Sequence, residues 1–229
     1  MKFEKTEVFN FEGALRGMRN PKNSWDRSDS YIAHGGHCVI NGVRQESFTI
    51  GEKDLQLAKT LINGGSEHRK FLRQIFVCVD ITAPLYWWKE FSTYKVGTVV
   101  NSTSTMHKLA STPITKECFE KIDADLITHD NISFDTAVGT YTFNSIYCII
   151  DTLESLRKSY LETKDKRIWK LLIQLLPSSW LQTRTVTMTY ENVFNMVKQR
   201  KNHKLTEWSV DFMEWAKTLP YASDFIFTE

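Results

Sequence analysis

A run of alternating apolar residues that leads into an aromatic segment and a hydroxyl-rich loop is the sequence feature that most limits the fold. The alternation over residues 71–81 predicts a strand buried in a sheet. Pro84 should then begin a helix that ends near Tyr94. Residues 96–108 are rich in serine and threonine, whose hydroxyls need hydrogen-bond partners when they are buried. We therefore expect this loop either to hold a polar ligand or to be solvated.

Hydrophobic periodicity and turn residues predict the remaining elements. Strands are expected at residues 2–9, 38–40, 47–50 and 184–189. The second and third should form a hairpin around Asn41-Gly42, a pair that favours a tight turn. Helices are expected at residues 11–19 after an Asn10 cap, and at 52–63, 115–123, 143–162, 166–176, 190–200 and 205–219. Because strands and helices do not alternate regularly, we predict an α+β fold with a mainly antiparallel sheet flanked by helices, in a single domain over residues 1–229.

Charge and composition argue against several classes of protein. The net charge of +2 does not favour a general nucleic-acid binder, and no apolar stretch has the length of a membrane span or a signal peptide. The four cysteines are far apart, which predicts reduced thiols in a cytoplasmic protein. His34 and His37 flank two glycines beside Cys38, but a further ligand is lacking, so we expect a flexible turn and no metal. Glycine-rich nucleotide-binding motifs are absent from the sequence.

Residues 83–104 resemble the signature segment of flavin-dependent thymidylate synthases. In that family an Ala-Pro pair, here Ala83-Pro84, leads to Gln-x-x-Arg-His-Arg and, seven residues later, to a serine. In this frame the glutamine and the three basic positions are occupied, in order, by Glu90, Thr93, Tyr94 and Lys95. Lys95 keeps a positive charge but lacks the planar fork of an arginine, and Tyr94 can stack on a flat ring.

The second half of the signature is also matched in part. After one inserted residue, Asn101 and Ser104 match the asparagine and the serine of the family. Ser102 stands where the family has a glutamate, and Met106 stands where it has a phosphate-binding arginine. The resemblance therefore implies that phosphate is bound by other cations, for which the candidates are Lys89, Lys95, Lys108 and Arg184.

Residues 68–73, which precede the signature segment, also align with the same family. His68 stands sixteen residues before Pro84, at the place of a histidine that contacts the flavin. Lys70 replaces a flavin-contacting threonine in this frame, and Arg73 replaces a glutamate. Without the resemblance, a lone histidine at the entrance of a strand would be read as structural.

A C-terminal segment also aligns with the family when residues are counted from Pro177 without gaps. In this frame Arg200 falls on an arginine that contacts the pyrimidine nucleotide. Thr189 and Glu191 replace an asparagine and an arginine that touch the flavin. A basic residue at the end of a helix can also simply complement the helix dipole, which is the alternative for Arg200.

The resemblance implies a homotetrameric enzyme that binds FAD and methylates dUMP reductively at C5, with methylenetetrahydrofolate and NADPH as co-substrates. The residues implied in FAD binding are His68, Lys70, Thr93, Tyr94 and Lys95. Those implied in binding the deoxyuridine nucleotide are Glu90, Asn101, Ser102, Ser104 and Arg200, with Ser104 as the catalytic candidate that positions the substrate. The alternative is a non-catalytic or altered-specificity nucleotide-binding homologue with a degenerate active site.

Overall fold

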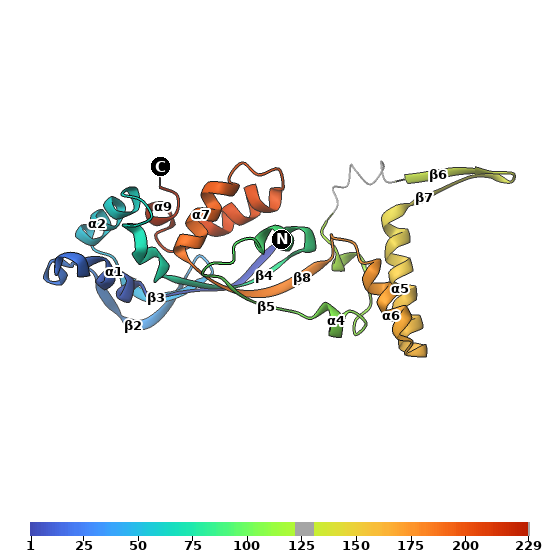
Figure 1. Ribbon diagram of the computed structural model, residues 1–229, viewed down its shortest axis with the longest axis horizontal. Coiled ribbons are helices and arrows are strands. Elements are labelled where there is room, and N and C mark those ends of the chain that lie inside the picture. The colour runs from blue at the N-terminus through green and yellow to red at the C-terminus, as the bar shows by residue number, and fades with distance from the viewer. Residues whose placement is uncertain (122–130, 229) are drawn as a thin grey trace. The chain divides into compact units, whose positions relative to one another are not determined.

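The computed structural model describes residues 1–121 and 131–228, which contain a six-stranded sheet and a separate hairpin (Figure 1). The strands of the sheet are β1 (Lys2–Phe9), β2 (Tyr31–Ile40), β3 (Val43–Thr49), β4 (Phe76–Pro84), β5 (Val99–Ser102) and β8 (Leu181–Thr189). Their order is β2-β3-β1-β4-β8-β5. β1 pairs in parallel with β3, whereas the β1–β4 and β2–β3 pairs are antiparallel. The hairpin consists of β6 (Asn131–Thr136) and β7 (Gly139–Asn144).

Helices lie between and after these strands in chain order and complete an α+β fold. They are α1 (Phe11–Arg19), α2 (Glu52–Asn63), α3 (Leu85–Phe91), α4 (Thr105–Lys108), α5 (Ser145–Thr163), α6 (Lys166–Gln174), α7 (Tyr190–Arg200), α8 (Met213–Lys217) and α9 (Ala222–Phe225). In Figure 1, α2, α7 and α9 lie on one side of strands β3 and β4. The predicted class, a mainly antiparallel sheet flanked by helices, is confirmed. Within the described residues, no helix combines the length and the apolarity needed to cross a membrane.

Terminal residues explain why α2, α5 and α7 lie close to their predicted positions. The amide of Gly64 bonds to the Thr60 carbonyl at 3.0 Å and closes the end of α2. The side chain of Asn144 accepts from the Tyr147 amide and caps α5. Thr189 and Asn192 form a capping box at the start of α7, each side chain bonding the other's amide. Such caps satisfy the amides that a helix leaves free at its start.

The predicted hairpin around Asn41-Gly42 is also confirmed. Ile40 pairs with Val43 across the turn, and Asn41 and Gly42 have φ values of 53° and 77°. Two successive residues with positive φ define the tight hairpin turn that an Asn-Gly pair favours. β2 extends back to Tyr31, through the two glycines between His34 and His37 at which we had expected a flexible turn.

The predicted strand over residues 71–81 begins too early. Phe71 and Leu72 are buried, with 2% and 0% exposure, but they lie in a 3-10 turn over Arg69–Arg73. The amide of Gln74 closes this turn by bonding to the Phe71 carbonyl at 2.9 Å. An apolar pattern does not distinguish a buried turn from a buried strand, and β4 starts only after the turn.

Pro84 ends β4 instead of beginning a helix. The first amides of α3, those of Leu85 and Tyr86, donate to the carbonyls of Trp180 and Ser178 at 3.0 and 3.1 Å. Partners outside the helix therefore satisfy its N-terminus, and the helix needs no proline at its first position. α3 also stops before the predicted end near Tyr94.

Local contacts change two further predictions. Asn10 does not cap α1, because its φ is 74° and its side-chain nitrogen donates instead to the Gln74 carbonyl at 2.8 Å. The predicted loop over residues 96–108 contains β5 and α4, and the β6–β7 hairpin had no counterpart among the predicted elements.

Two predicted helices are shorter or irregular. The helix over residues 115–123 is reduced to a 3-10 turn at Lys116–Cys118, and residues 122 and 123 lie outside the described part of the chain. The helix over residues 205–219 is divided into a π-helical turn over Glu207–Phe212 and the following α8. A π-helical turn inserts one extra residue into a helical path.

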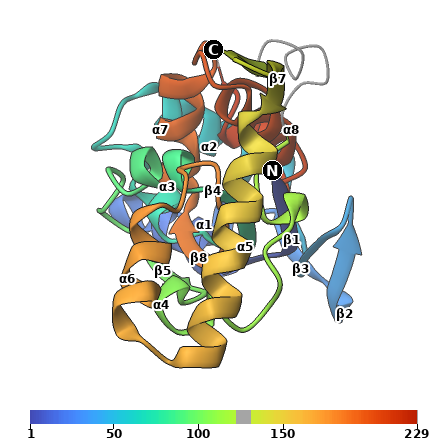
Figure 2. The ribbon, with the colours of Figure 1, turned by 90° about the vertical axis from the view of Figure 1, so that its right-hand side faces the viewer.

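The chain divides into two compact units. The first comprises Met1–Thr82, Glu90–Asn101 and Thr183–Glu229, and the second comprises Ala83–Lys89 and Ser102–Gln182. In the second unit α5 and α6 pack side by side in both views (Figure 2). Its core consists of Leu109, Ile114, Phe119, Ile150, Leu153 and Leu172. A single domain over residues 1–229 stays a prediction.

A buried ion pair joins α1 to α2 in the first unit. Arg19, which is 5% exposed, donates from Nε to Oδ1 of the fully buried Asp54 at 2.5 Å. The hydroxyls of Ser28 and Ser30 each donate to Oδ2 of this carboxylate at 2.5 Å. Burial alone raises the pKa of Asp54, but the hydrogen bonds from Ser28, Ser30 and Arg19 outweigh it and hold the pKa below its usual value.

Candidate functional site

Helix α7 organises the candidate site of the first unit. The amide of Tyr190, its first residue, donates to the Ile75 carbonyl at 2.9 Å. The Tyr190 ring is fully buried and its hydroxyl donates to the Pro220 carbonyl at 2.9 Å. Burial raises the pKa of this hydroxyl well above its usual value. Backbone and core contacts therefore fix the start of the helix, independently of the polar side chains of the site.

Three of the predicted residues meet at the end of α7. Arg200 donates from Nη1 to Oε2 of Glu90 at 2.9 Å and from Nε to the hydroxyl of Tyr94 at 2.8 Å. The three side chains are half-buried, and the Arg200 guanidinium also lies 5.5 Å from the centre of the Tyr94 ring. The structure thus brings together Glu90 and Arg200, predicted to bind the nucleotide, with Tyr94, predicted to face the flavin.

Three residues that we had not assigned to the site complete this cluster. The Tyr94 hydroxyl donates to Oε1 of Gln199 at 3.0 Å. Nε2 of His203 lies 3.3 Å from Oε2 of Glu90. The Arg200 guanidinium lies 5.0 Å from the centre of the buried Trp208 ring. Gln199 and His203 stand within three positions of Arg200 at the end of the helix. This closeness in the sequence could have indicated that they belong to the same site.

The side chain of Asn192 also holds the loop that carries Tyr94 against α7. Nδ2 of Asn192 donates to the Val96 carbonyl at 2.7 Å. Gly97 has a φ of +77°, and a Cβ atom there would lie 2.9 Å from Oδ1 of Asn192. A side chain at position 97 would therefore be strained and would also collide with the residue that fixes the loop.

Two other predicted cofactor residues of this loop lie at its surface. The amide and the hydroxyl of Thr93 both donate to the Glu90 carbonyl, at 3.0 and 2.8 Å. Lys95 is exposed and makes no ion pair with any residue that the structure describes. Lys95 is therefore a cation that an anionic ligand can reach.

The turn around His68 packs against the first half of α7. His68 is exposed, and the ammonium of Lys70 lies 3.1 Å from a carboxylate oxygen of Glu67. The neighbouring Arg73 donates to Glu191 from Nε at 2.5 Å and from Nη2 at 3.3 Å. This hydrogen bonding to Glu191 raises the pKa of the Arg73 guanidinium.

Two arginines therefore share the carboxylate of Glu191. Nε of Arg69 lies 3.4 Å from Oε1 of Glu191, and its guanidinium lies 4.6 Å from the centre of the Phe194 ring. Positions 73 and 191, at which the resemblance expects a glutamate and an arginine, thus carry the opposite charges and pair with one another. Arg200 stands nine positions after Glu191 on α7, which corresponds to about 14 Å along the helix axis.

The remaining signature residues lie on and after β5. Asn101 and Ser102 are exposed at the end of this strand. Ser104 belongs to the second unit, is half-buried, and accepts the Lys108 amide through its carbonyl at 3.0 Å. The nucleotide-binding roles of Asn101, Ser102 and Ser104 stay predictions.

The other candidate cations differ in exposure. Lys89 and Lys108 are exposed residues of the second unit. Arg184 is half-buried on β8, and burial lowers its pKa.

Within the described residues, no three His, Cys, Asp or Glu side chains gather as a metal site would require, and the side chain of His34 is not among those described. All four cysteines are free.

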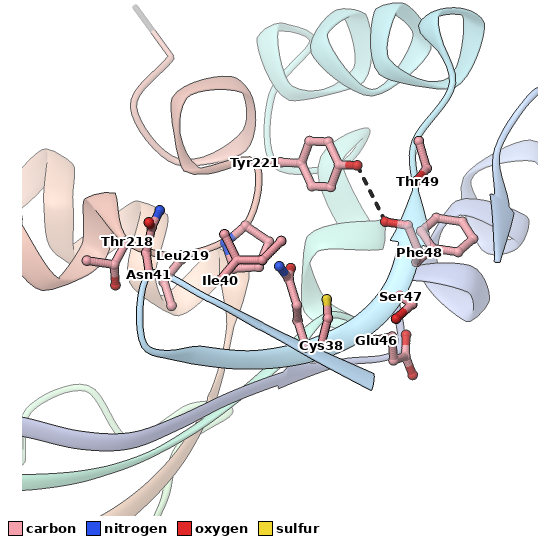
Figure 3. Close-up of a pocket in the computed structure, with 12 residues that line it drawn as sticks. Cys38, Ile40, Asn41, Glu46, Ser47, Phe48, Thr49, Thr218, Leu219 and Tyr221 are labelled. Carbon is pink, nitrogen blue, oxygen red and sulfur yellow. Dashed lines mark hydrogen bonds between the residues drawn. The ribbon is translucent and has the colours of Figure 1, made fainter. Parts of the chain in front are cut away.

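Two cavities of the first unit lie among other residues. One, of about 370 Å³, is lined by residues of α1, of β2 and of the segment between them, including Arg19, Trp25 and Tyr31, and by Phe48 of β3. The other, of about 460 Å³, lies between the β2–β3 hairpin and residues 218–221 (Figure 3). None of the residues predicted for FAD or dUMP lines either cavity.

The arrangement of strands and helices is that of flavin-dependent thymidylate synthases. The flavin-dependent thymidylate synthase ThyX of Helicobacter pylori, solved in complex with FAD and dUMP, is similar with a TM-score of 0.65 over 98% of each chain and 17% sequence identity. A second structure of ThyX from Helicobacter pylori, also with FAD and dUMP, gives a TM-score of 0.64 and 16% identity over 99% of this chain and 97% of that one. No protein-family model matches the sequence, and no curated protein matches it. The shared feature is therefore the fold.

Proposed function

We propose that this protein is a flavin-dependent thymidylate synthase-like enzyme that methylates dUMP reductively at C5 to give dTMP. The observation that carries the proposal is the cluster of Glu90, Tyr94 and Arg200 at the end of α7, in a chain with the ThyX fold. Methylenetetrahydrofolate would supply the carbon and NADPH the reducing equivalents. We further propose a cytoplasmic homotetramer, for which the mass of the purified protein in solution is the test.

The chemistry of the donor set fits FAD. FAD is an anionic dinucleotide with a flat ring, so its site needs cations and an aromatic or apolar surface. Lys95 is an exposed cation without an ion-pair partner among the described residues, and Lys198 and Arg69 each place a positive charge within 4.6 Å of the centre of the buried Phe194 ring. His68, Lys70 and Thr93 add exposed polar groups in the same unit.

The residues of the chain would bind and orient the reactants. When bound, FAD supplies the hydride transfer that a reductive methylation requires. Arg200 and Glu90 place a donor beside an acceptor, which suits the polar edge of a pyrimidine ring. Tyr94 would present its ring to the flavin while its hydroxyl holds Arg200 and Gln199 in place. Ser104 would position the nucleotide.

A second candidate is a nucleotide-binding homologue without this activity or with altered specificity. The observation that favours it is the neutralisation of two guanidinium groups. Arg200 is paired with Glu90, and Arg73 is paired with Glu191. An ion pair lowers the affinity of a guanidinium for a further anion, because the carboxylate competes with the ligand.

The absorbance spectrum of the purified full-length chain separates these candidates first. The protein is incubated with FAD, gel-filtered and scanned for flavin absorbance, and is then assayed for conversion of dUMP with methylenetetrahydrofolate and NADPH. Retained flavin together with dTMP formation supports the enzyme. Retention of dUMP without flavin supports the binding homologue, and retention of neither contradicts both.

A pair of tyrosine variants links the result to the site. Tyr94→Ala removes a ring and a hydroxyl from the cluster, so flavin retention and dTMP formation should both fall. Tyr147→Ala is the matched control, because Tyr147 is 52% exposed on α5 and belongs to the second unit. Equal loss in the two variants would contradict the assignment of Tyr94.

A further inference from the structure

The cavity between the β2–β3 hairpin and residues 218–221 is lined on the hairpin side by Cys38, Ile40, Asn41 and residues 45–49. Cys38 pairs with Gln45 and Ile40 pairs with Val43, so these four side chains share a face. Three of them, those of Cys38, Ile40 and Gln45, line the cavity, whose volume is about 460 Å³. A cavity of this size falls within the range of small-molecule sites.

Gln45 is the unusual residue of this wall. Its side chain is only 9% exposed, yet no residue in the described parts of the chain forms a hydrogen bond with its amide group. A glutamine amide carries an acceptor oxygen and a donor nitrogen, and on the lining of the cavity both remain available to a ligand that enters it. The strand holds this group at the cavity through its register with Val8 and Cys38 on the two neighbouring strands.

The opposite wall is fixed and offers no competing group. The hydroxyl of Tyr221 accepts the Ile50 amide at 2.9 Å and lies 3.5 Å from the Phe48 carbonyl, the contact drawn in Figure 3. Leu219 and Pro220 add apolar surface beside it. A ring that entered this space would meet apolar groups on its faces and the amides of Gln45 and Asn41 at its edge.

The lining is neutral or acidic. Among the described residues that line the cavity there is no lysine, arginine or histidine, and Glu46 is the charged one. Its carboxylate accepts the Phe11 amide at 3.2 Å. A phosphate group would find no cation here and would lie near this carboxylate, so the cavity disfavours an anion.

We propose that this cavity binds an uncharged planar ring with a hydrogen-bond donor beside an acceptor on one edge, as in the adenine of a nucleoside, and that the Gln45 amide reads that edge. Adenine presents its N6 amino group beside N7, and a glutamine amide pairs with both atoms. The site is separate from the residues assigned to FAD and dUMP, so the proposal goes beyond the proposed function and does not depend on it.

Calorimetric titration of the full chain tests the proposal, with adenosine as the probe and AMP as its charged counterpart. We expect adenosine to bind with a Kd below about 1 mM, and AMP to bind no better than adenosine. Absence of adenosine binding at that concentration would overturn the proposal. Binding of AMP more than about tenfold tighter than adenosine would also overturn it, because a cationic site elsewhere would then be responsible.

Matched glutamine variants assign the binding to one side chain. Gln45→Met removes the donor and the acceptor while keeping the length of the side chain, and it should weaken adenosine binding by about tenfold. Gln56→Met makes the same change at an exposed position of α2 and should leave the affinity unchanged. Native affinity in Gln45→Met would show that the amide does not read the ligand.

Protection of Cys38 provides a readout in the unmodified protein, and it remains informative if Gln45→Met does not fold. Cys38 lies opposite Gln45 and lines the same cavity, whereas Cys148 is exposed in the second unit. Saturating adenosine should slow alkylation of Cys38 by iodoacetamide and leave that of Cys148 unchanged, as followed by peptide mass spectrometry. Unchanged alkylation of Cys38 under saturation would exclude binding in this cavity.

Discussion

Replacing Asp54 by alanine should remove a large part of the stability of the first unit. The Asp54 carboxylate is fully buried and accepts hydrogen bonds from Arg19, Ser28 and Ser30, each at 2.5 Å. The variant leaves the Arg19 guanidinium, which is 5% exposed, without its anion. Breaking one partner of a buried ion pair costs about 3–5 kcal/mol, because the remaining charge stays desolvated.

The expected loss lies near the lower end of that range. Arg19 keeps a hydrogen bond from Nη1 to the Ser24 carbonyl at 3.2 Å, which partly compensates the missing carboxylate. We therefore expect a decrease of about 3 kcal/mol in the free energy of unfolding. For a chain of this length, that corresponds to a decrease of about 6–12 °C in Tm.

Urea unfolding followed by tryptophan fluorescence measures this loss. The double variant Arg19→Met with Asp54→Ala should be more stable than Asp54→Ala alone, because neither charge is then buried without a partner. Asp26→Ala, at an exposed aspartate, should change the free energy of unfolding by less than about 0.5 kcal/mol. A loss below about 1 kcal/mol in Asp54→Ala, or a double variant no more stable than the single one, would refute this reasoning.

Three further predictions concern other contacts. The hydrogen bond from Arg157 lowers the pKa of Glu154 from 4.5 to about 2, so its stabilising contribution is complete above pH 4.5 and is lost as the pH falls toward 2. Urea midpoints should therefore fall less steeply over this range in Glu154→Gln. Gly97→Ala should lower the free energy of unfolding in urea by about 1–2 kcal/mol, because of its positive φ and the contact with Asn192. Glu90→Gln should weaken dUMP binding about threefold in calorimetric titration, because it removes the charged acceptor that is proposed to meet the pyrimidine edge.

Each of these three predictions has an opposing outcome. Identical slopes of stability against pH in the native chain and in Glu154→Gln would mean that this carboxylate keeps an ordinary pKa. Unchanged stability in Gly97→Ala would mean that the loop accommodates a side chain there. Tighter dUMP binding in Glu90→Gln would mean that Glu90 only neutralises Arg200 and does not contact the nucleotide.

The sequence predicted those elements whose ends are set by local chemistry. α7 begins after the Thr189–Asn192 capping box and α2 ends at Gly64, and both follow the predicted bounds. Burial alone was less informative, because Phe71 is as buried in its 3-10 turn as it would be in a strand. Pro84 was misplaced because the amides that follow it find partners far along the sequence.

The sequence predicted individual residues of the candidate site, but it did not predict which charged residues form ion pairs there. Counting from Pro84 and from Pro177 identified Tyr94 and Arg200, which lie 2.8 Å apart between hydroxyl and Nε. The pairing of Arg73 with Glu191 was not predicted, although both substitutions were visible, because a contact across more than a hundred positions depends on packing. Counting residues from a shared motif therefore locates single positions. The three-dimensional structure is needed to show which charged side chains pair with one another.

The π-helical turn over Glu207–Phe212 has a consequence for comparing this chain with its structural neighbours. Such a turn contains one residue more than the α-helical path on either side of it. An alignment to a protein that is α-helical throughout this segment would therefore be displaced by one position after Phe212. Residues on the two sides of the turn should be matched separately, with a single-residue gap permitted within it.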